Sequence, residues 1–355
     1  MIKENILALA LLFLSLGSCN STPDNTDPVW GSLDFIDLTG QVMETDSLPL
    51  PYRITISTEE KLLFVVNRQG NNNGYIWVFD LVSGNFLKSF LRSGAGPGEL
   101  LHVGHLQILD QELVVFGTLE KKLLIYDLQG IRAEGLPMPK QVITIKANSV
   151  RSPYMINNNL IVDTRFNFKE DSIARLNFYN GEGELVSISG GFPDASADLG
   201  PVHLTEAYRC FVGVNAGKVV LTNAYTDLME IYDEQGNLLE VVNGPDNFEP
   251  LMKPRESGGG VMIAPTSETR RAYSFVSVGN DEILSFYSGE LNSKSQNNKR
   301  RFVLFSSSGE PLKSYNLDIP ILHFDVDWES RVVYGVTDEY KDGDNELAVI
   351  TYKLD

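Results

Sequence analysis

The segment IWVFDLVSG, residues 76–84, is the first copy of a pattern that recurs along this chain. Its apolar half ends in an aromatic residue followed by a small polar one, which predicts a buried strand that stops at Asp80. An Asp side chain can bond the backbone a few residues ahead, and a nearby glycine accepts a positive φ angle. The segment therefore predicts a strand, a tight turn containing Gly84, and a second strand running back.

Five further copies follow at nearly regular spacing. They are LIYD with Gly130, LNFYN with Gly183, EIYD with Gly236, VLFS with Gly309, and VITYK at the end of the chain. The equivalent positions 80, 127, 180, 233, 306 and 353 are separated by 47, 53, 53, 73 and 47 residues. A period of roughly 45–55 residues composed only of strands is typical of a β-propeller.

Two more strands precede each copy. The first strands are expected at 52–56, 105–109, 153–156, 208–214, 272–278 and 322–326. The second strands are expected at 62–66, 113–116, 160–163, 219–221, 283–286 and 332–336. Each unit then has four strands, except the last, which has three. We expect residues 33–38 to supply the missing outermost strand, so that both chain ends complete the last blade and no sheet edge stays open.

Other all-β architectures fit this pattern less well. A β-sandwich has about seven to nine strands and a parallel β-helix has shorter repeats, whereas about twenty-four strands are expected here. A seventh blade would have to lie in the longest gap, where residues 244–270 are rich in Gly, Pro and Ser and are interpreted as a loop. We therefore expect an all-β, six-bladed propeller. The segments 244–270 and 288–299 should rise on one face, the first as a mobile lid or as disorder.

The first nineteen residues, MIKENILALALLFLSLGSC, have the pattern of a secretory signal. Lys3 precedes an apolar run from Ile6 to Leu16, which is too short to span a membrane as a helix. The small residues before Cys19 resemble the lipobox of bacterial lipoproteins, which implies cleavage before Cys19 and acylation of that residue. The alternative is an ordinary secretory signal with a chance cysteine.

This signal sets the expected domain organisation and location. We expect a signal peptide at 1–18, a flexible lipidated tether at 19–30 and a propeller domain at 31–355. The lipid would anchor the protein in the bacterial cell envelope. The outer membrane is the expected membrane, and its periplasmic and surface faces remain alternatives. If Cys19 carries lipid, Cys210 is the only other cysteine, and its aromatic neighbours predict a buried, inert thiol.

Composition and charge exclude several classes of protein. The 355 residues are 43% hydrophobic and 21% charged, which is typical of a globular chain. The 47 acidic and 29 basic side chains give a net charge of −18. Nucleic acids and anionic lipid surfaces attract basic proteins, so neither is expected as a direct partner of the propeller.

The segment RSGAGPGEL, residues 92–100, resembles the R-x-G-x-GPGE segment of the six-bladed, TolB-like β-propeller lipoproteins of Bacteroidetes. The resemblance covers residues 19–355 and implies an envelope lipoprotein. TolB itself binds protein partners, which implies interaction rather than chemistry. This chain lacks the separate N-terminal domain of TolB, so that specific role is not implied. Because the glycines lead into a strand, we expect a tight crossing between two blades, with Arg92 and Glu99 paired, rather than a phosphate-binding loop.

Few residues suggest catalysis. His102 and His105 form an H-x-x-H motif, and a metal site from His105, His323 and Asp325 across blades is conceivable, but polar residues at the channel mouth are the favoured interpretation. The acidic loop 338–346 is a weak calcium candidate without EF-hand spacing. No nucleophile elbow, zinc-protease motif or dinucleotide-binding glycine pattern occurs. We assign no catalytic residue, no metal ligand and no cofactor.

One basic or potentially basic residue stands near the start of each predicted first strand. These residues are Arg53, His105, Arg151, Arg209, Arg271 and His323. Because first strands line the channel of a propeller, we expect a ring of these side chains at the loop-face mouth. In an acidic protein, such a ring would attract a carboxylate or an acidic sugar. The alternative is structural pairing with neighbouring acids.

Two functions are consistent with these observations. The favoured one is a lipid-anchored envelope module that binds a protein or an anionic glycan on the loop face. The alternative is a propeller hydrolase or lyase with a metal-assisted site in the channel. Bound metal at a stoichiometry near one would favour the alternative, and a co-purified partner would favour the binding module.

Overall fold

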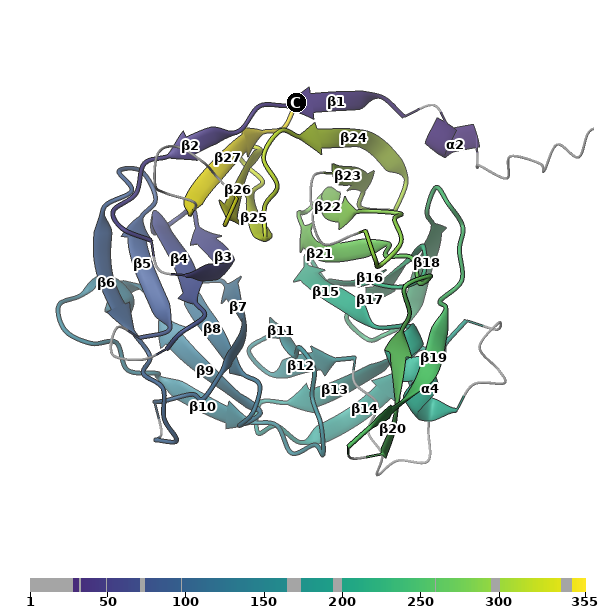
Figure 1. Ribbon diagram of the computed structural model, residues 1–355. Coiled ribbons are helices and arrows are strands. Elements are labelled where there is room, and N and C mark those ends of the chain that lie inside the picture. The colour runs from purple at the N-terminus through teal and green to yellow at the C-terminus, as the bar shows by residue number, and fades with distance from the viewer. Residues whose placement is uncertain are drawn as a thin grey trace, which may run out of the picture.

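The computed structural model describes residues 28–31, 33–48, 50–70, 74–96, 98–164, 174–193, 200–258, 260–294, 301–339 and 347–355. Within these ranges the chain forms six antiparallel blades arranged in a ring (Figure 1). In each blade the first strand lies at the centre of the ring and the sheet runs outward to the rim. The predicted six-bladed propeller with four-stranded blades is therefore confirmed.

The first three blades follow chain order from centre to rim. Blade one contains β3 (Pro51–Ser57), β4 (Leu62–Asn67), β5 (Ile76–Asp80) and β6 (Phe86–Phe90). Blade two contains β7 (Val103–Leu109), β8 (Glu112–Gly117), β9 (Lys122–Asp127) and β10 (Gln141–Thr144), with helix α3 (Leu128–Arg132) before β10. Blade three contains β11 (Tyr154–Asn157), β12 (Leu160–Asp163), β13 (Leu176–Asn180) and β14 (Leu185–Ser189).

The other three blades have the same order. Helix α4 (Pro201–Ala207) leads into blade four, which contains β15 (Cys210–Asn215), β16 (Lys218–Asn223), β17 (Leu228–Asp233) and β18 (Leu238–Asn243). Blade five contains β21 (Tyr273–Val278), β22 (Glu282–Tyr287), β23 (Arg301–Ser306) and β24 (Pro311–Leu317). Blade six contains β25 (His323–Asp327), β26 (Val332–Thr337) and β27 (Ala348–Lys353), and β2 (Gln41–Met43) is its outermost strand.

The recurrent turn has the chemistry that the sequence predicts. The Asp80 carboxylate accepts the N–H groups of Val82 and Ser83 at 3.1 and 2.9 Å, and Gly84 has a φ of +74°. The equivalent residues Gly183, Gly236 and Gly309 also have positive φ. Asp127 differs, because its carboxylate accepts the N–H of Gly130 and caps helix α3 instead. The same side-chain capping thus starts either a hairpin turn or a helix.

Each blade is held by the apolar surface that it shares with its two neighbours. On β4, Leu62 and Phe64 belong to a buried cluster shared with blade two, whereas Leu63 and Val65 belong to one shared with blade six. This alternation follows from the two-residue period of a strand. Comparable clusters lie at the other four blade interfaces. The core is therefore distributed around the ring, one cluster per interface.

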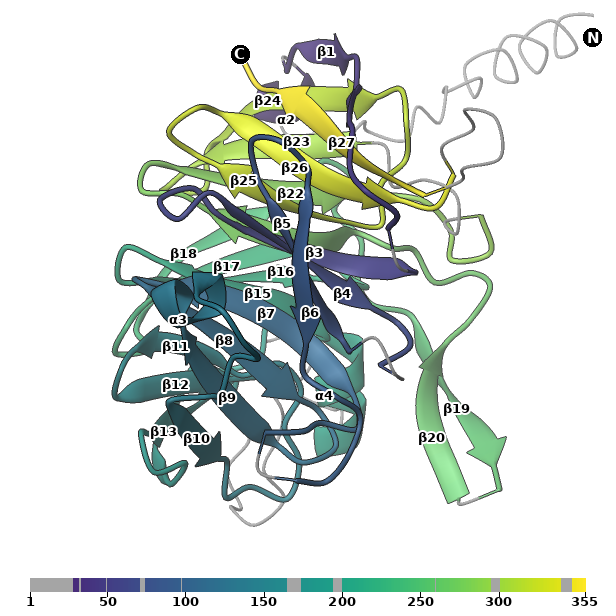
Figure 2. The ribbon, with the colours of Figure 1, turned by 90° about the vertical axis from the view of Figure 1, so that its left-hand side faces the viewer.

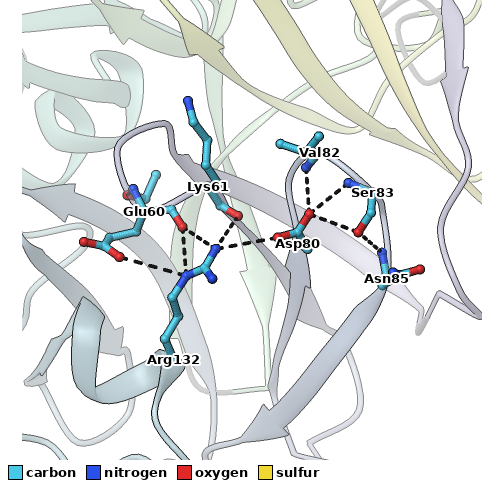
Figure 3. Close-up of polar contacts among 8 residues, drawn as sticks. Glu60, Lys61, Asp80, Val82, Ser83, Asn85 and Arg132 are labelled. Atoms are coloured by element: carbon cyan, nitrogen blue, oxygen red, sulfur yellow. Dashed lines mark hydrogen bonds and ion pairs between the residues drawn. The ribbon is translucent and has the colours of Figure 1, made fainter.

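A polar contact reinforces the interface between blades one and two (Figure 3). The guanidinium of Arg132, at the end of α3, donates to the Glu60 carbonyl at 2.7 and 3.0 Å and lies 3.6 Å from the Asp80 carboxylate. The same Asp80 carboxylate holds its own turn. Arg132 thus ties the helix of blade two to two turns of blade one.

The N-terminal segment 28–43 closes the ring, but not through the residues predicted. Strand β1 (Phe35–Leu38) pairs in parallel with β24, so it adds a fifth strand to blade five. Strand β2, a few residues later, pairs antiparallel with β27 and completes the last blade. Closure of the last blade by an N-terminal strand is therefore confirmed, whereas its assignment to residues 33–38 was wrong. Trp30, in the short helix α2 (Pro28–Gly31), is already buried against blades four and five.

The segment 244–270 is not the loop that its composition predicts. It contains a hairpin of β19 (Met252–Ser257) and β20 (Gly260–Pro265), which extends away from the ring (Figure 2). Met252 packs with α4 at the base of this hairpin. The segment contacts the described part of 288–299, because the Asn292 N–H donates to the Thr269 carbonyl at 2.7 Å. Within the described ranges, no helix has both the length and the apolar character needed to cross a bilayer.

Candidate ligand-binding channel

A central cavity of about 1040 Å³ is lined by the first strands of all six blades. First strands of neighbouring blades run in the same direction. The His323 ring accepts the Ile54 N–H, and Asp325, two residues further along β25, accepts the N–H of Ile56, two residues further along β3. The cavity therefore has a strand-start mouth and a strand-end mouth. The links between blades that carry α4 and the β19–β20 hairpin enter first strands, so they belong to the strand-start face.

Side chains of neighbouring blades bond the inner backbone edges of first strands. The Asp325 carboxylate accepts the Ile56 N–H at 3.1 Å and the Thr55 hydroxyl at 2.7 Å. The Gln107 amide bonds both the N–H and the carbonyl of Met155, at 2.9 and 2.7 Å. Edge strands need partners for their backbone groups, so these contacts stabilise the wall of the channel. Burial raises the pKa of Asp325 above its ordinary value.

Arg53, on β3, is a cation of this wall. Its guanidinium carbon is 5.4 Å from the centre of the Phe275 ring and 5.8 Å from that of Tyr52. Its Nε is buried without a hydrogen-bond partner, and no carboxylate of the described residues forms an ion pair with it. Burial lowers the pKa of Arg53, while the phenols of Tyr154 and Tyr52 favour its charge. The channel thus contains a partly desolvated positive charge with which no carboxylate of the described residues pairs.

Phe275 reaches this position through an irregular backbone. Strand β21 has a bulge between Ser274 and Val276, and Phe275 between them has a φ of +54°. Its ring contacts the rings of His323 and Phe211, with centroids 4.5 and 5.0 Å away. A bulky side chain rarely adopts positive φ, because its Cβ crowds the backbone. The bulge therefore places an aromatic ring beside Arg53 at a cost in local strain.

Arg151 and Arg209 lie at the strand-start mouth and share one acid. The Arg151 guanidinium bonds Glu206 of α4 at 2.7 Å, and that of Arg209 bonds the other oxygen of the same carboxylate. Both arginines line the cavity. Their pairing matches the structural alternative considered for the six basic residues, and it leaves one more positive than negative charge in this group of three.

The six basic residues predicted to form a ring are only partly brought together. Arg53, Arg151, Arg209 and His323 line the cavity, whereas Arg271 lies outside it and bonds Asn292 at 2.7 Å. His105 is not at the mouth but buried, 2% exposed and stacked on Tyr154. Burial and the nearby Arg53 charge lower the pKa of His105 to about 3. His105 is therefore neutral at pH 7, and the basic residues that line the cavity come from blades one, three, four and six rather than from all six.

The two mouths of the cavity differ in charge. The cations Arg151 and Arg209 precede their first strands, and Arg53 is the third residue of β3. Acidic residues line the opposite end, where first strands finish, and they are Asp110, Asp327 and Glu329. This polarity favours approach of an anion through the strand-start mouth.

Several other sequence predictions concern residues near or outside this channel. Cys210 is buried as predicted, and burial raises the pKa of its thiol. Cys19 and most of the acidic loop, residues 340–346, lie outside the described residues. In the described part of the chain, no three or more His, Cys, Asp or Glu side chains are arranged to hold a metal ion. The proposed cross-blade set of His105, His323 and Asp325 is not such a group.

The glycine-rich segment after blade one makes a closed crossing between β6 and β7. The Glu99 carboxylate accepts the Gly96 N–H at 3.0 Å, so it bonds its own loop rather than Arg92. A Cβ on Gly94 would lie 2.0 Å from a carboxylate oxygen of Glu99. A side chain at this position would displace the Glu99 carboxylate from the loop that it closes, so the glycine has a structural role, as the interpretation of the segment predicts.

Phe275 and Phe211 are the candidate ligand contacts that the sequence did not identify. Regular alternation along 272–278 gives no sign of a bulge, since neither Gly nor Pro interrupts the strand. The tyrosine beside His105, Tyr154, was likewise assigned only to a strand. Charge at strand starts was the detectable signal, and it found Arg53.

Comparisons with known proteins agree with this architecture. A family described as TolB-like 6-blade propeller-like matches residues 34–329. One similar structure, a Bacteroides fragilis protein described provisionally as exported, has 10% identity and a TM-score of 0.51, covering 89% of this chain and 94% of its own. Another, a DUF4221 family member from Bacteroides vulgatus, has 12% identity and a TM-score of 0.58, covering 90% and 97%.

These two structures are similar to this chain in fold alone, because their sequence identity is low. No curated protein matches the chain. The family match, by contrast, extends from β1 to the turn after β25 and includes the first strands of all six blades. The chain therefore belongs to the TolB-like 6-blade propeller-like family.

Proposed function

We propose that this protein is a lipid-anchored cell-envelope module that binds an anionic ligand, such as an acidic glycan, in its central channel. The observation that carries this proposal is Arg53, a partly buried arginine in the cavity wall whose Nε is buried without a hydrogen-bond partner and which has no carboxylate partner among the described residues. Desolvating an unbalanced charge is costly, so a ligand that supplies a negative charge gains more here than at an exposed arginine.

The rest of the cavity is consistent with a ligand site. It combines apolar rings with a few fixed polar groups, which is the usual composition of small-molecule pockets. Phe211 and Phe275 supply partly exposed aromatic surface near Arg53. The acidic strand-end mouth would repel an anion, so the ligand would enter from the strand-start face. A protein partner on that face remains an alternative occupant, but the charge argument concerns the cavity and favours a ligand small enough to enter it.

The proposal is binding rather than catalysis because the polar groups of the wall have structural bonds. Asp325 accepts three hydrogen bonds, from Thr55, Ile56 and Val326. The His323 Nδ1 accepts the Ile54 N–H at 3.4 Å. A general base needs a lone pair directed at substrate, whereas these lone pairs face the neighbouring strand. Arg53 is the group of this set that is left to act on a ligand.

The envelope location rests on the N-terminal sequence and on one similarity. The apolar run before Cys19 has the length of a signal core, and small residues precede the cysteine. A Bacteroides protein of the same fold is provisionally described as exported. Export and lipid attachment are therefore part of the proposal.

Equilibrium binding of trigalacturonate and of its fully methyl-esterified, neutral form tests the proposed function. The acid should bind, and its affinity should fall as salt increases, because screening weakens charge attraction. Arg53→Met should weaken binding at least tenfold, the expected order for loss of a charged hydrogen bond. Arg209→Ala is the matched control and should have a smaller effect, since Arg209 is more exposed and paired with Glu206. Equal binding of the acid by wild type and Arg53→Met would contradict the proposal.

A further inference from the structure

We infer that the Arg53 site is specific for a monocarboxylate whose two carboxylate oxygens both bond the guanidinium. We infer also that Phe275 is the residue that positions the guanidinium for this contact. This inference rests on the proposed function and adds the ligand class and a positioning residue. It starts from three observations at one place: a strained backbone, a guanidinium beside two aromatic rings and a single unbalanced charge.

The strain at Phe275 is the first observation. Its φ of +54° is paired with a shift of register in β21, so the strand leaves regular pairing at this residue alone. A glycine or asparagine would tolerate this conformation better than phenylalanine. The described structure compensates by packing the ring against Phe211 and His323. Strain of this kind at a cavity wall points to a role for the ring itself.

The contact of Arg53 with two aromatic rings is the second observation. A guanidinium on an aromatic face keeps its N–H groups in its own plane, where they form a fork that matches the two oxygens of a carboxylate. The Arg53 guanidinium carbon lies within 6 Å of both the Phe275 and Tyr52 ring centres, the range of cation–π attraction. Its Nε has no bond to protein. Two rings and a hydrogen bond to the Tyr52 phenol therefore hold the guanidinium, and its Nε is the donor that no group of the described residues occupies.

The charge balance is the third observation, and it selects the class of anion. One guanidinium balances one negative charge. Arg151 and Arg209 share the Glu206 carboxylate, and Arg209 is 44% exposed, so solvent screens it. A phosphate monoester is close to a dianion at pH 7, so it would keep an unbalanced charge in the cavity. A carboxylate would not.

The nearest acid of the wall also fits this assignment. The Asp325 carboxylate is turned toward β3 and β25, whose N–H groups and Thr55 hydroxyl it accepts. Its burial raises its pKa, and Tyr154 interacts with the charges of both Arg53 and Asp325. The wall therefore offers the ligand carboxylate one cationic fork while its own acid is bound to backbone.

Titration calorimetry with three probes of matched size tests the inference: galacturonate, galactose 6-phosphate and galactose. Wild type should bind galacturonate at least tenfold more tightly than galactose 6-phosphate, and galactose least tightly. Arg53→Lys keeps the charge but removes the fork, so it should lose about tenfold in galacturonate affinity. Phe275→Leu should lose roughly three- to thirtyfold, whereas Phe275→Tyr, which retains an aromatic face, should restore binding.

The outcomes separate this inference from the proposed function. If no anion binds in an Arg53-dependent way, the proposed function fails. If anions bind through Arg53 but galactose 6-phosphate equals galacturonate, or if Arg53→Lys binds as well as wild type, the bidentate carboxylate fails and the proposed function stands. Thermal unfolding of every variant identifies loss of fold. Phe275→Leu with wild-type affinity, or a loss that Phe275→Tyr shares at equal stability, overturns the positioning role of the ring.

Discussion

Asp227 is a buried carboxylate whose environment favours its protonated form. It is 2% exposed, and its Oδ2 accepts the N–H groups of Asp246 and Asn247 at 2.7 and 2.9 Å. The Tyr287 hydroxyl lies 3.0 Å from the same oxygen and 2.7 Å from the Asp246 carboxylate. One phenol has a single proton for two carboxylates, and the Asp227 Oδ1 is buried without a partner. Burial raises the pKa of Asp227 to about 6.

This shift predicts a defined pH dependence of stability. The folded pKa lies above the model value of 3.8, so the stabilisation from the bound proton is complete below about pH 4 and is lost as pH rises through 6. At pH 7 the loss is at most about 3 kcal/mol. Asp227→Asn keeps the shape without titrating. The free energy of unfolding of the variant minus that of wild type should therefore increase by up to about 3 kcal/mol from pH 4 to pH 7.

Denaturant unfolding of variant and wild type at both pH values measures this difference. The contributions of ionisable groups that both proteins contain cancel in it. Asp80→Asn is the control of opposite sign, because backbone and side-chain hydrogen bonds from Ser83 lower the pKa of Asp80. Its stability relative to wild type should fall between pH 4 and pH 7. A difference for Asp227→Asn that is the same at both pH values would contradict the assignment.

Single residues differ in how far the sequence predicts their position. Arg53 and His323 were found because they stand at the starts of first strands, whose location follows from alternation. Phe275 was missed because its position depends on a bulge, and no Gly or Pro in the strand indicates that bulge. His105 was placed at the mouth, yet the register of β7 buries it beside Tyr154. Side-chain direction changes with each residue of register, so a prediction of the strand alone does not fix it.

At the level of elements, the N-terminal segment links three blades from outside. The Trp30 indole donates to the Asn243 carbonyl of blade four at 3.0 Å. Strand β1 extends blade five, and β2 completes blade six. The closing strand was assigned to residues 33–38 instead of β2. Both strands are short, and strand counting identifies a missing partner without saying which residues pair. A parallel partner for β24 is not predicted by hairpin patterns at all.

Two internal deletions should separate the contributions of β1 and β2. Removing residues 28–40 leaves β2 on β27 but loses Trp30 and β1. We expect a folded monomer whose Tm is lower by roughly 5–10 °C, the order expected for loss of a buried Trp. Removing 28–43 also exposes the outer edge of β27, which should cause aggregation. Size-exclusion chromatography and thermal unfolding measure both. A monomeric 28–43 deletion with the Tm of the shorter deletion would contradict the closure by β2.

The hairpin of β19 and β20 marks where element prediction fails for a physical reason. Apolar alternation in the sequence predicts buried strands. This hairpin is solvated on most of its surface, with Val261 69% exposed and Met262 48% exposed. Its strands include prolines and glycines, which are typical of loops. Strands that contribute to a blade interface were located within a few residues, whereas one that leaves the ring had no core to impose a pattern.

For the whole molecule, the ring geometry converts a weak sequence signal into an asymmetric channel. Six parallel first strands place all their starts at one mouth and all their ends at the other. Basic residues near starts and acids near ends therefore accumulate at opposite openings, although the chain as a whole carries −18. No single blade has this polarity. It follows from closure, so the same N-terminal segment that completes the ring also supports the proposed site.

That segment is also where the proposed lipid anchor would join the propeller. Cys19 precedes the described chain by nine residues, and nine residues span at most about 30 Å when fully extended. Trp30 is fixed on the rim between blades four and five. An acylated Cys19 would therefore attach to the propeller at this rim and keep the rim within about 30 Å of the membrane. Anchoring and ligand entry would then use different parts of the ring.

Cys19→Ser should release the protein from the membrane without altering the propeller. A myristoyl-sized chain gives only marginal binding and several chains give stable anchoring, so loss of acylation should move most of the protein to the soluble fraction. Cell fractionation and the intact mass of the mature chain measure this, and the Tm of the soluble variant should equal that of the detergent-solubilised wild type. Cys210→Ser is the matched control and should remain with the membrane, because Cys210 is buried in the propeller. A wild-type mass without acyl chains, or a Cys19→Ser variant that stays in the membrane fraction, would contradict the anchor.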